Sequence, residues 1–587
     1  MIAQVVPDIP SFAVDDGFAY EIPEDLSGIE VGTLVRVPLS GRRVKGYVTA
    51  VRRGVPDRPL RPIQGASGDL PVFDRALLET ARWVSTYYVA PLSVVLSRCA
   101  PPNLPRSHPA PEVAVPTITD DELAAWSEAQ VVRGRTRPRY LVTGNPSIAT
   151  IAPSIGPVVA TNQNVFVAAP TVEEAAAAAR ELTTHFSDRV RLATSQTSAA
   201  ERTEAWALST SDSGVVIVGT REIAFWGASS IGLAVVVEEG RRAYKAKQTP
   251  TYHVRDVFRR RSAVERFGLL FVGAVPTTDA VAAGVEVTTG RQRVWPLVDV
   301  VDRREEPGAL VMDRTRIAIG AVLRSRGSVF VMVNRRGYAA AFRCVACQEV
   351  RRCTNCGAGL GRSGTCERCG SEHDGCAECG GVRFQPLGAG IGRVVDDLSR
   401  SFPGSVGEVG SNTPVQVGTE RDLVELDPVD LGIAIDADGM LLAPHYRASE
   451  DALRSLVRVA LATTPGRGRK ALVQTAQPDH PVMTTLRAGR PMPFVEDELA
   501  IRAETGFPPV GALLALETDA PGDAADAVLR EAGEAATVLG PAPLGEGHRW
   551  LFQGDDLDKV RIRLRSVVQT LRDGGARVRV DADPVDL

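Results

Sequence analysis

The chain contains little lysine, few aromatic residues and no long hydrophobic run. Only five of its 67 basic residues are lysines, at positions 45, 245, 247, 470 and 559, so the other 62 are arginines. Apolar stretches such as Ile231–Val237 have the length of a buried strand, far below the roughly 18 residues that a membrane helix needs. The first residues lack the basic and apolar regions of a signal peptide, so we expect a cytoplasmic protein without a membrane span.

Composition and length predict a folded protein of several domains. Apolar residues make up 44% of the 587-residue sequence and charged residues 24%, which is typical of globular proteins. At about 100–200 residues per domain, this length predicts about three to five domains. A net charge of −4 excludes a protein that coats nucleic acid over its whole surface, but it leaves room for a local basic groove.

The order of predicted strands and helices indicates an α/β protein with five parts. Residues 1–105 predict a mostly-β domain with a hairpin turn at Ser40-Gly41 and a helix at 73–89, and the proline-rich residues 106–140 predict a linker. Residues 141–300 and 301–485 alternate apolar strands with helices, as in parallel sheets covered on both faces. Residues 486–587 predict a small α+β domain.

Eight of the nine cysteines lie between positions 344 and 379, whereas Cys99 is isolated and is expected to be buried. They form four C-x-x-C pairs: Cys344 and Cys347, Cys353 and Cys356, Cys366 and Cys369, Cys376 and Cys379. Each C-x-x-C turn presents two thiolates to one side of a tetrahedral zinc, so four pairs predict two zinc sites. Spacing alone leaves open which pairs combine.

Other interpretations of the cysteines are less favoured. Disulfides are not expected in a chain without an export signal, and an all-cysteine tetrahedron leaves no open position for a catalytic zinc. His373 is a candidate substitute ligand. A glycine follows the second cysteine of three pairs, at Gly357, Gly370 and Gly380, and predicts a tight turn with positive φ that brings N–H groups near the sulfurs.

Short segments in a characteristic order resemble one family along most of the chain. The run VNRRGYAAAFRC (333–344) leads into the four pairs, and PLGAGIGRVVDDLSRSFPG (386–404) follows them. The segments IVGTREIAF (217–225), AYKAKQTPTYHVRD (243–256) and VQTAQPDHPV (473–482) keep the same order. Together they resemble the PriA family (primosomal protein N′), the replication restart helicases.

The resemblance implies a fold and a function for each part. It implies an N-terminal domain that binds DNA 3′ ends, two RecA-like lobes of a superfamily-2, 3′-to-5′ DNA helicase, a zinc-binding insertion at 344–379 and a small C-terminal domain. The linker is short for the family's winged helix, which we expect to be reduced or missing. The implied partners are branched, forked and single-stranded DNA, single-strand-binding protein, the replicative helicase and other primosome proteins. We expect a nucleoid-associated monomer.

The resemblance also implies how the cysteines combine, since the outer pairs join in the family and the inner pairs join. One zinc would be held by Cys344, Cys347, Cys376 and Cys379. The other would be held by Cys353, Cys356, Cys366 and Cys369.

The residues that drive a helicase motor are missing from this sequence. A P-loop needs a glycine-rich loop with a lysine on the phosphates, but no lysine lies between positions 45 and 245, and YLVTGNPSIATIAPSIG (140–156) stands in that place. The family's D-E-E-H box becomes Val237-Glu238-Glu239-Gly240, and its S-A-T becomes Gly273-Ala274-Val275. The segments GTERDLVE (418–425) and RVALATTP (458–465) lack the expected lysine and arginines, for which GRGR (466–469) is an alternative position.

These losses predict a protein without helicase activity that does not use ATP and Mg²⁺. Glu238 and Glu239 are expected to be remnants or solvated side chains rather than a working base. The main alternative is an active ATP-dependent 3′-5′ DNA helicase with relocated motifs. A third hypothesis is a zinc-ribbon protein that binds only other proteins.

The N-terminal part retains features of a DNA-binding surface, because cations beside aromatic rings suit single-strand ends. The candidate residues are two aromatics and a basic turn: Phe18, Tyr20, Gly41, Arg42, Arg43 and Lys45. In the family's F-D-Y string, which holds the 3′ nucleotide, Ala19 replaces the aspartate. The alternative is a solvated hairpin with core aromatics. Arg335 and Arg336 are candidates for contacts with either phosphates or carboxylates.

Overall fold

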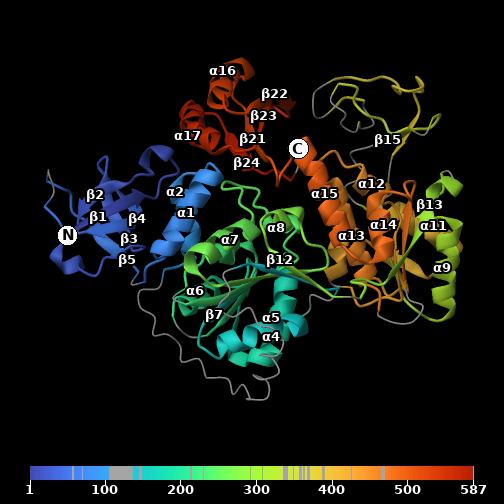
Figure 1. Ribbon diagram of the computed structural model, residues 1–587, viewed down its shortest axis with the longest axis horizontal. Coiled ribbons are helices and arrows are strands. Elements are labelled where there is room, and N and C mark those ends of the chain that lie inside the picture. Colours follow the sequence, from blue (N-terminus) through green and yellow to red (C-terminus); the bar gives the residue numbers. More distant parts are fainter. Residues whose placement is uncertain are drawn as a thin grey trace.

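The computed structural model confirms an α/β protein with two parallel-sheet lobes flanked by smaller antiparallel domains (Figure 1). It describes residues 1–55, 59–68, 70–104, 137–144, 148–211, 214–228, 230–290, 292–306, 308–334, 342–347, 349–355, 360, 364–366, 371–386, 390–424, 426–464 and 470–585. None of the helices in these ranges combines the length and the apolar character needed to cross a bilayer.

The N-terminal domain is a small barrel. Its antiparallel strands are β1 (Ile2–Pro7), β2 (Phe18–Glu21), β3 (Leu34–Leu39), β4 (Arg42–Arg52) and β5 (Gly65–Ser67), in the order β2-β1-β4-β3-β5. The Glu21 N–H donates to the Arg61 carbonyl (3.0 Å) and the Ile63 N–H donates to the Glu21 carbonyl (2.9 Å), which joins β2 to the segment before β5. Ser40 and Gly41 both have positive φ, as the predicted two-residue hairpin turn requires.

Two helices, α1 (Arg75–Tyr87) and α2 (Leu92–Leu96), cover one side of this barrel. Helix α1 begins at the Asp74 cap, whose carboxylate accepts from the Leu77 N–H, and its apolar residues occur at helical spacing. The helix also contacts α7 (Val254–Glu265) of the first lobe, so it connects the barrel to the body of the molecule.

Lobe 1 contains a parallel sheet in the order β12-β6-β11-β10-β7-β9-β8. The strands are β6 (Arg139–Val142), β7 (Asn164–Ala168), β8 (Val190–Ala193), β9 (Val216–Gly219), β10 (Ile231–Val237), β11 (Gly268–Gly273) and β12 (Glu286–Thr289). The helices are α4 (Ile148–Val159), α5 (Val172–Phe186), α6 (Ala199–Ser209), α7 and α8 (Thr278–Ala282). Thr171 caps α5, because its hydroxyl accepts from the Glu174 N–H (3.2 Å).

Lobe 2 contains a second parallel sheet, in the order β13-β20-β19-β14-β18-β17. The strands are β13 (Leu297–Asp302), β14 (Val329–Met332), β17 (Val406–Glu408), β18 (Val415–Gly418), β19 (Leu431–Ala434) and β20 (Lys470–Thr475). The helices are α9 (Asp313–Arg324), α11 (Ile391–Ser401), α12 (Asp438–Leu441), α13 (Ala448–Leu461), α14 (Pro481–Ala488) and α15 (Met492–Thr505).

Residues just outside the range 301–485 also pack in lobe 2, and the predicted bounds stay a prediction. Strand β13 pairs with β20, so the sheet begins at Leu297. Leu486 and Phe494 belong to the same hydrophobic core, so α14 and α15 are part of this lobe. Which core these two helices join is decided by their packing.

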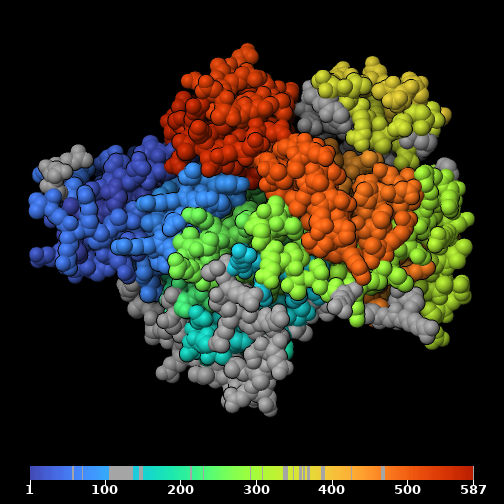
Figure 2. All heavy atoms as spheres, viewed as in Figure 1, coloured from blue at the N-terminus to red at the C-terminus, as the bar shows by residue number. Residues whose placement is uncertain are grey.

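The C-terminal domain packs between the barrel and lobe 2 (Figure 2). Its sheet has the order β22-β23-β21-β24, with β21 (Ala512–Thr518), β22 (Thr537–Leu544), β23 (Gly547–Gly554) and β24 (Val578–Ala582), covered by α16 (Gly522–Ala532) and α17 (Asp558–Asp573). Helix α16 ends at Ala532, and the chain turns at Gly533 to enter β22. A Cβ there would lie 2.4 Å from Val538 Cγ2.

Candidate DNA-binding, metal and inter-lobe sites

The structure separates the predicted DNA-binding residues. Tyr20 lies in the barrel core with 3% of its surface exposed, and its hydroxyl donates to the Pro38 carbonyl (3.2 Å). Phe18 is 40% exposed, so it alone of the two offers a ring face to a base. Phe18 pairs with Val5, which pairs with Val48. Along β4, Arg43 and Arg42 lie five and six residues from Val48, or roughly 17–20 Å at 3.4 Å per residue, and Lys45 lies three residues from it.

The barrel carries cations that are not neutralised by nearby carboxylates. The ion pairs found for its described residues and for α1 are Arg565–Asp15 and Arg260–Glu79, and in both the cation comes from another domain. No carboxylate lies within 4.0 Å of the other described cations of the barrel, which are Arg36, Arg42, Arg43, Lys45, Arg52, Arg53 and Arg61. Phosphate-binding surfaces need such unpaired cations.

Four cysteines form the metal site that the outer pairs were expected to make. The Sγ atoms of Cys344, Cys347, Cys376 and Cys379 all lie within 4.8 Å of one another. Two of the sulfur–sulfur distances are 3.5 Å, close to the edge of about 3.8 Å of a tetrahedron with Zn–S bonds of 2.3 Å. These four residues fit a structural zinc, and the structure brings together the set that the resemblance implied.

The surrounding backbone also suits thiolate ligands. Strand β15 (Phe342–Cys344) pairs with β16 (Phe384–Pro386) and brings the two C-x-x-C turns together. Gly380 has a φ of +71°, as predicted, and Gly381 packs so closely that a Cβ would lie 3.0 Å from Cys344 Sγ. Hydrogen bonds from the N–H groups of Cys347 and then Ala346, with the neighbouring thiols, lower the pKa of Cys344 to about 7.

The second predicted zinc site is only partly within the described residues. Cys353 and Cys366 are buried and pack with Leu360. His373 Nε2 lies 3.2 Å from Cys353 Sγ, which keeps this histidine among the candidate ligands. Cys356, Cys369, Gly357 and Gly370 lie outside the described residues, as do Arg335, Arg336 and GRGR (466–469). The second zinc therefore stays a prediction.

The segment at the P-loop position keeps the strand and the helix around it. Strand β6 ends at Val142 and α4 begins at Ile148, so only five residues connect them. Gly144 in this connection lies directly against the start of lobe 2, where a Cβ would be 1.8 Å from the Val294 carbonyl oxygen. Ligands of open α/β sheets bind outside the carboxyl ends of the strands, and here the other lobe lies against that edge.

Glu239 after β10 is buried and Glu238 is partly buried, so of the two expected alternatives the solvated one does not apply to Glu239. Glu239 is fully buried and accepts from the Thr277 N–H (3.0 Å) and from Arg255 Nη1 (3.4 Å). Burial raises its pKa above the usual value despite the nearby arginine. Glu238 pairs with Arg241 (2.8 Å) and Arg458 (3.6 Å). The sequence did not show that Arg241, Arg255 and Arg458 pair with these carboxylates, because Arg458 lies more than 200 positions away.

Arginines from lobe 2 fill the space beside the altered D-E-E-H box. Gly240, which the resemblance aligns with the family's histidine, is closely packed, because a Cβ there would lie 2.7 Å from Thr277 Cγ2 and 2.8 Å from Arg454 Nε. Arg458 contacts Glu420 of its own lobe (2.7 Å) and Glu174 of lobe 1 (3.7 Å). The cavity lined by Glu238, Arg454 and Arg458 measures about 20 Å³, which is room for about one water molecule.

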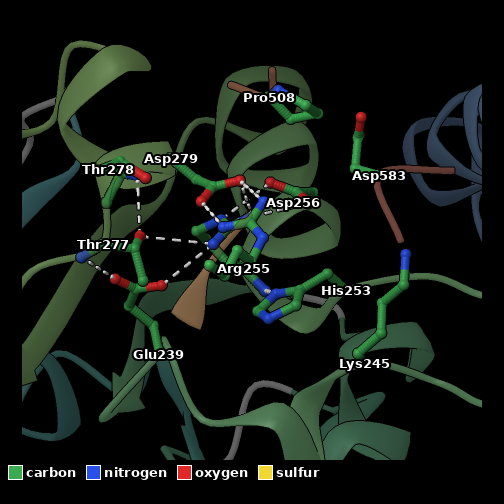
Figure 3. A network of polar contacts seen from close by, with 12 residues as sticks. Glu239, Lys245, His253, Arg255, Asp256, Thr277, Thr278, Asp279, Pro508 and Asp583 are labelled. Carbon is green, nitrogen blue, oxygen red and sulfur yellow. Dashed lines mark hydrogen bonds and ion pairs between the residues drawn. The ribbon is translucent and has the colours of Figure 1, made fainter. Parts of the chain in front are cut away.

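A second group of ion pairs joins the lobes around Asp279 and Arg255 (Figure 3). Asp279 of lobe 1 accepts from Arg255 (3.1 Å) and from Arg447 of lobe 2 (2.9 Å). Burial alone would raise the pKa of Asp279, but these two guanidinium groups outweigh it and hold the pKa well below its usual range. Arg242 of lobe 1 pairs with Asp451 of lobe 2 at 2.8 Å.

Glu450 is the centre of a third group. Its fully buried carboxylate accepts from the Thr278 N–H (3.1 Å) across the lobe boundary, and from Arg454 (2.7 Å) and Arg502 (2.6 Å). Burial acts to raise its pKa, but Arg454, Arg502 and Arg447 together bring the pKa far below its usual value. Glu450, Arg454 and Arg458 lie on one face of α13, since they are spaced by four residues. A charged helix face is usually solvated, so its role was not visible in the sequence.

Comparisons with known proteins agree with this architecture. A family model described as a 3′ DNA-binding domain (3′BD) of PriA matches residues 4–101. The chain is 30% identical to the probable replication restart protein PriA of Deinococcus radiodurans over 75% of this chain and 54% of the relative. It is 23% identical to the replication restart protein PriA of Synechocystis over 76% of this chain and 62% of the relative.

These relatives are longer than the chain, which spans little more than half of their length. Among solved structures, RecG bound to a three-way DNA junction is similar with a TM-score of 0.34 and 12% identity, over 65% of this chain and 46% of that one.

Proposed function

We propose, from the premise that this chain belongs to the PriA family, that it is a replication restart protein that binds abandoned or stalled forks without unwinding them. The observation that carries the proposal is the match of residues 4–101 to a 3′ DNA-binding domain, on a barrel whose cations are unpaired. Phe18 would stack on a base at the strand end, and Arg43 and Lys45, which follow Gly41, would contact phosphates. Its partners would be forked DNA, single-strand-binding protein and the replicative helicase.

The second part of the proposal is that this protein has no ATP-driven helicase activity. A helicase needs phosphate grip, a metal anchor and arginines at the γ-phosphate, and an arginine finger alone is worth on the order of 10³–10⁵ in rate. The lack of a lysine between positions 45 and 245, where a P-loop lysine would lie, supports the proposal. The contact of Gly144 with lobe 2 supports it as well. It is also supported by the pairing of Glu238 and Glu239 with arginines of the chain itself.

Zinc would have a structural role in this protein. The four outer cysteines would hold one ion, and the inner cysteines, with His373 as a further candidate, would hold a second. A four-thiolate zinc leaves no open coordination position, so its contribution is to fold the insertion from lobe 2. The insertion would then offer a rigid surface to the primosome proteins.

Two measurements test the proposal. Fluorescence anisotropy should show tighter binding to a fork with a 3′ end than to a blunt duplex of equal length, and equal affinity would contradict fork recognition. ATP turnover should stay at background when single-stranded DNA is added. Turnover that rises with the DNA would instead support the alternative, an active 3′-5′ helicase with relocated motifs.

A further inference from the structure

The β3–β4 hairpin carries three cations on one face, and one of them was not among the predicted residues. Arg36 of β3 lies directly opposite Lys45 of β4, and Pro38 lies opposite Arg43. Residues opposite one another in an antiparallel pair share a face, so Arg36, Arg43 and Lys45 lie on the same side. Arg42 lies opposite Leu39, one step along the strand, and therefore belongs to the other face.

The pairing of Arg36 with Lys45 works against folding. The Cβ atoms of directly opposite residues lie about 4.5–5.5 Å apart and those of diagonal neighbours about 7–8 Å apart, and like charges at such positions destabilise a sheet. No carboxylate lies within 4.0 Å of the three cations among the residues that the structure describes. These three cations lower the stability of the folded sheet and have no neighbouring carboxylate to neutralise them, which indicates that they bind an anionic ligand.

The environment of the cluster leaves it open to such a ligand. Lys45 and Arg43 are exposed and Arg36 is half-buried, and Arg43 Nη2 donates to the Gln64 carbonyl (3.2 Å), which orients its guanidinium. Asp8 is an acidic residue beside the cluster, and its backbone N–H donates to the Lys45 carbonyl (2.8 Å). Burial raises the pKa of Asp8, and the charge of Lys45 acts in the opposite direction without an ion pair.

We propose that Arg36, Arg43 and Lys45 form one binding site for backbone phosphates of DNA, and that Arg42 is not part of it. This inference rests on the proposed function, because it assumes that the barrel binds DNA. A guanidinium contacts two phosphate oxygens in parallel, and a lysine acts as a point charge beside it. Because Phe18 lies two strands away, the site would hold the strand some nucleotides from the terminal base.

The test is the salt dependence of binding to a single-stranded oligonucleotide, measured by anisotropy between 50 and 200 mM salt. Each lost phosphate contact lowers the slope of log K against log salt by about 0.7 on single strands. In each of the variants R36A, R43A and K45A, the slope of log K against log salt should be smaller by this amount. Their deficit relative to the wild type should then be about 2.6 times larger at 50 mM than at 200 mM, which is fourfold salt raised to the power 0.7. R42A is the matched control and should keep the wild-type slope.

The outcomes separate this inference from the proposed function. Wild-type protein that fails to bind any oligonucleotide would refute the proposed function. Wild-type protein that binds while R36A keeps the full slope, or while R42A loses as much as R43A, would overturn the inference alone. R36K retains the charge and should restore the slope, which shows that the loss in R36A comes from the cation and not from a damaged barrel.

Discussion

Glu450 offers the most direct test of how the two lobes are held together. Its carboxylate has no exposed surface and neutralises Arg454 and Arg502 while it accepts the Thr278 N–H from the other lobe. The substitution E450Q keeps the size of the side chain but removes its charge. Two buried guanidinium groups then lose this partner, and removing one member of a buried ion pair costs about 3–5 kcal/mol.

Hydrogen exchange followed by mass spectrometry is the suitable assay, because a chain of several domains does not unfold in one step. If the lobes are joined as the contacts indicate, E450Q should lower protection about 150- to 5,000-fold in residues 274–283 and 447–461, the exchange equivalent of 3–5 kcal/mol. Protection in the barrel should not change. The loss should therefore be confined to the facing elements of the two lobes.

The matched control is E79Q, which removes an ion pair of the same length. Glu79 and Arg260 lie 2.7 Å apart, as do Glu450 and Arg454, but the Glu79 side chain is 58% exposed. An exposed pair contributes about 0–1 kcal/mol, so E79Q should change protection less than about sixfold. Equal effects of the two variants would refute the view that burial of these ion pairs joins the lobes.

Three further predictions concern the metal, the strand end and pH. C376S should lose one equivalent of zinc by elemental analysis whereas C99S keeps the wild-type content, and unchanged zinc in C376S would exclude the outer site. F18A should weaken binding to 3′-tailed DNA by about 1–3 kcal/mol, the value of one base stacked on an aromatic ring, whereas F18W should bind normally. Asp279 has a folded-state pKa below its unfolded value of about 3.9, so its stabilisation is complete above that value and is lost as the pH falls below about 4. D279N should therefore show a shallower loss of hydrogen-exchange protection in acid, and an identical pH profile would contradict the assignment.

Much of the fold and one site could be predicted from the sequence, because they depend on local patterns. Apolar strands that alternate with helices specify parallel sheets, and the Ser40-Gly41 turn formed as predicted because it depends on a few adjacent residues. The C-x-x-C spacing likewise identified thiolate pairs. The lack of lysine between positions 45 and 245 is read directly from the sequence and does not depend on how the chain folds.

Only the tertiary structure decided which side chains meet. It combined the outer cysteine pairs, placed Tyr20 inside the barrel and Arg36 beside Lys45, and brought Glu238 to Arg458 across 220 positions of the chain. Periodicity shows which residues share a face, but not what covers that face. The partner of a charge is set by the packing of distant elements, and this packing makes the charged face of α13 part of the junction of the two lobes.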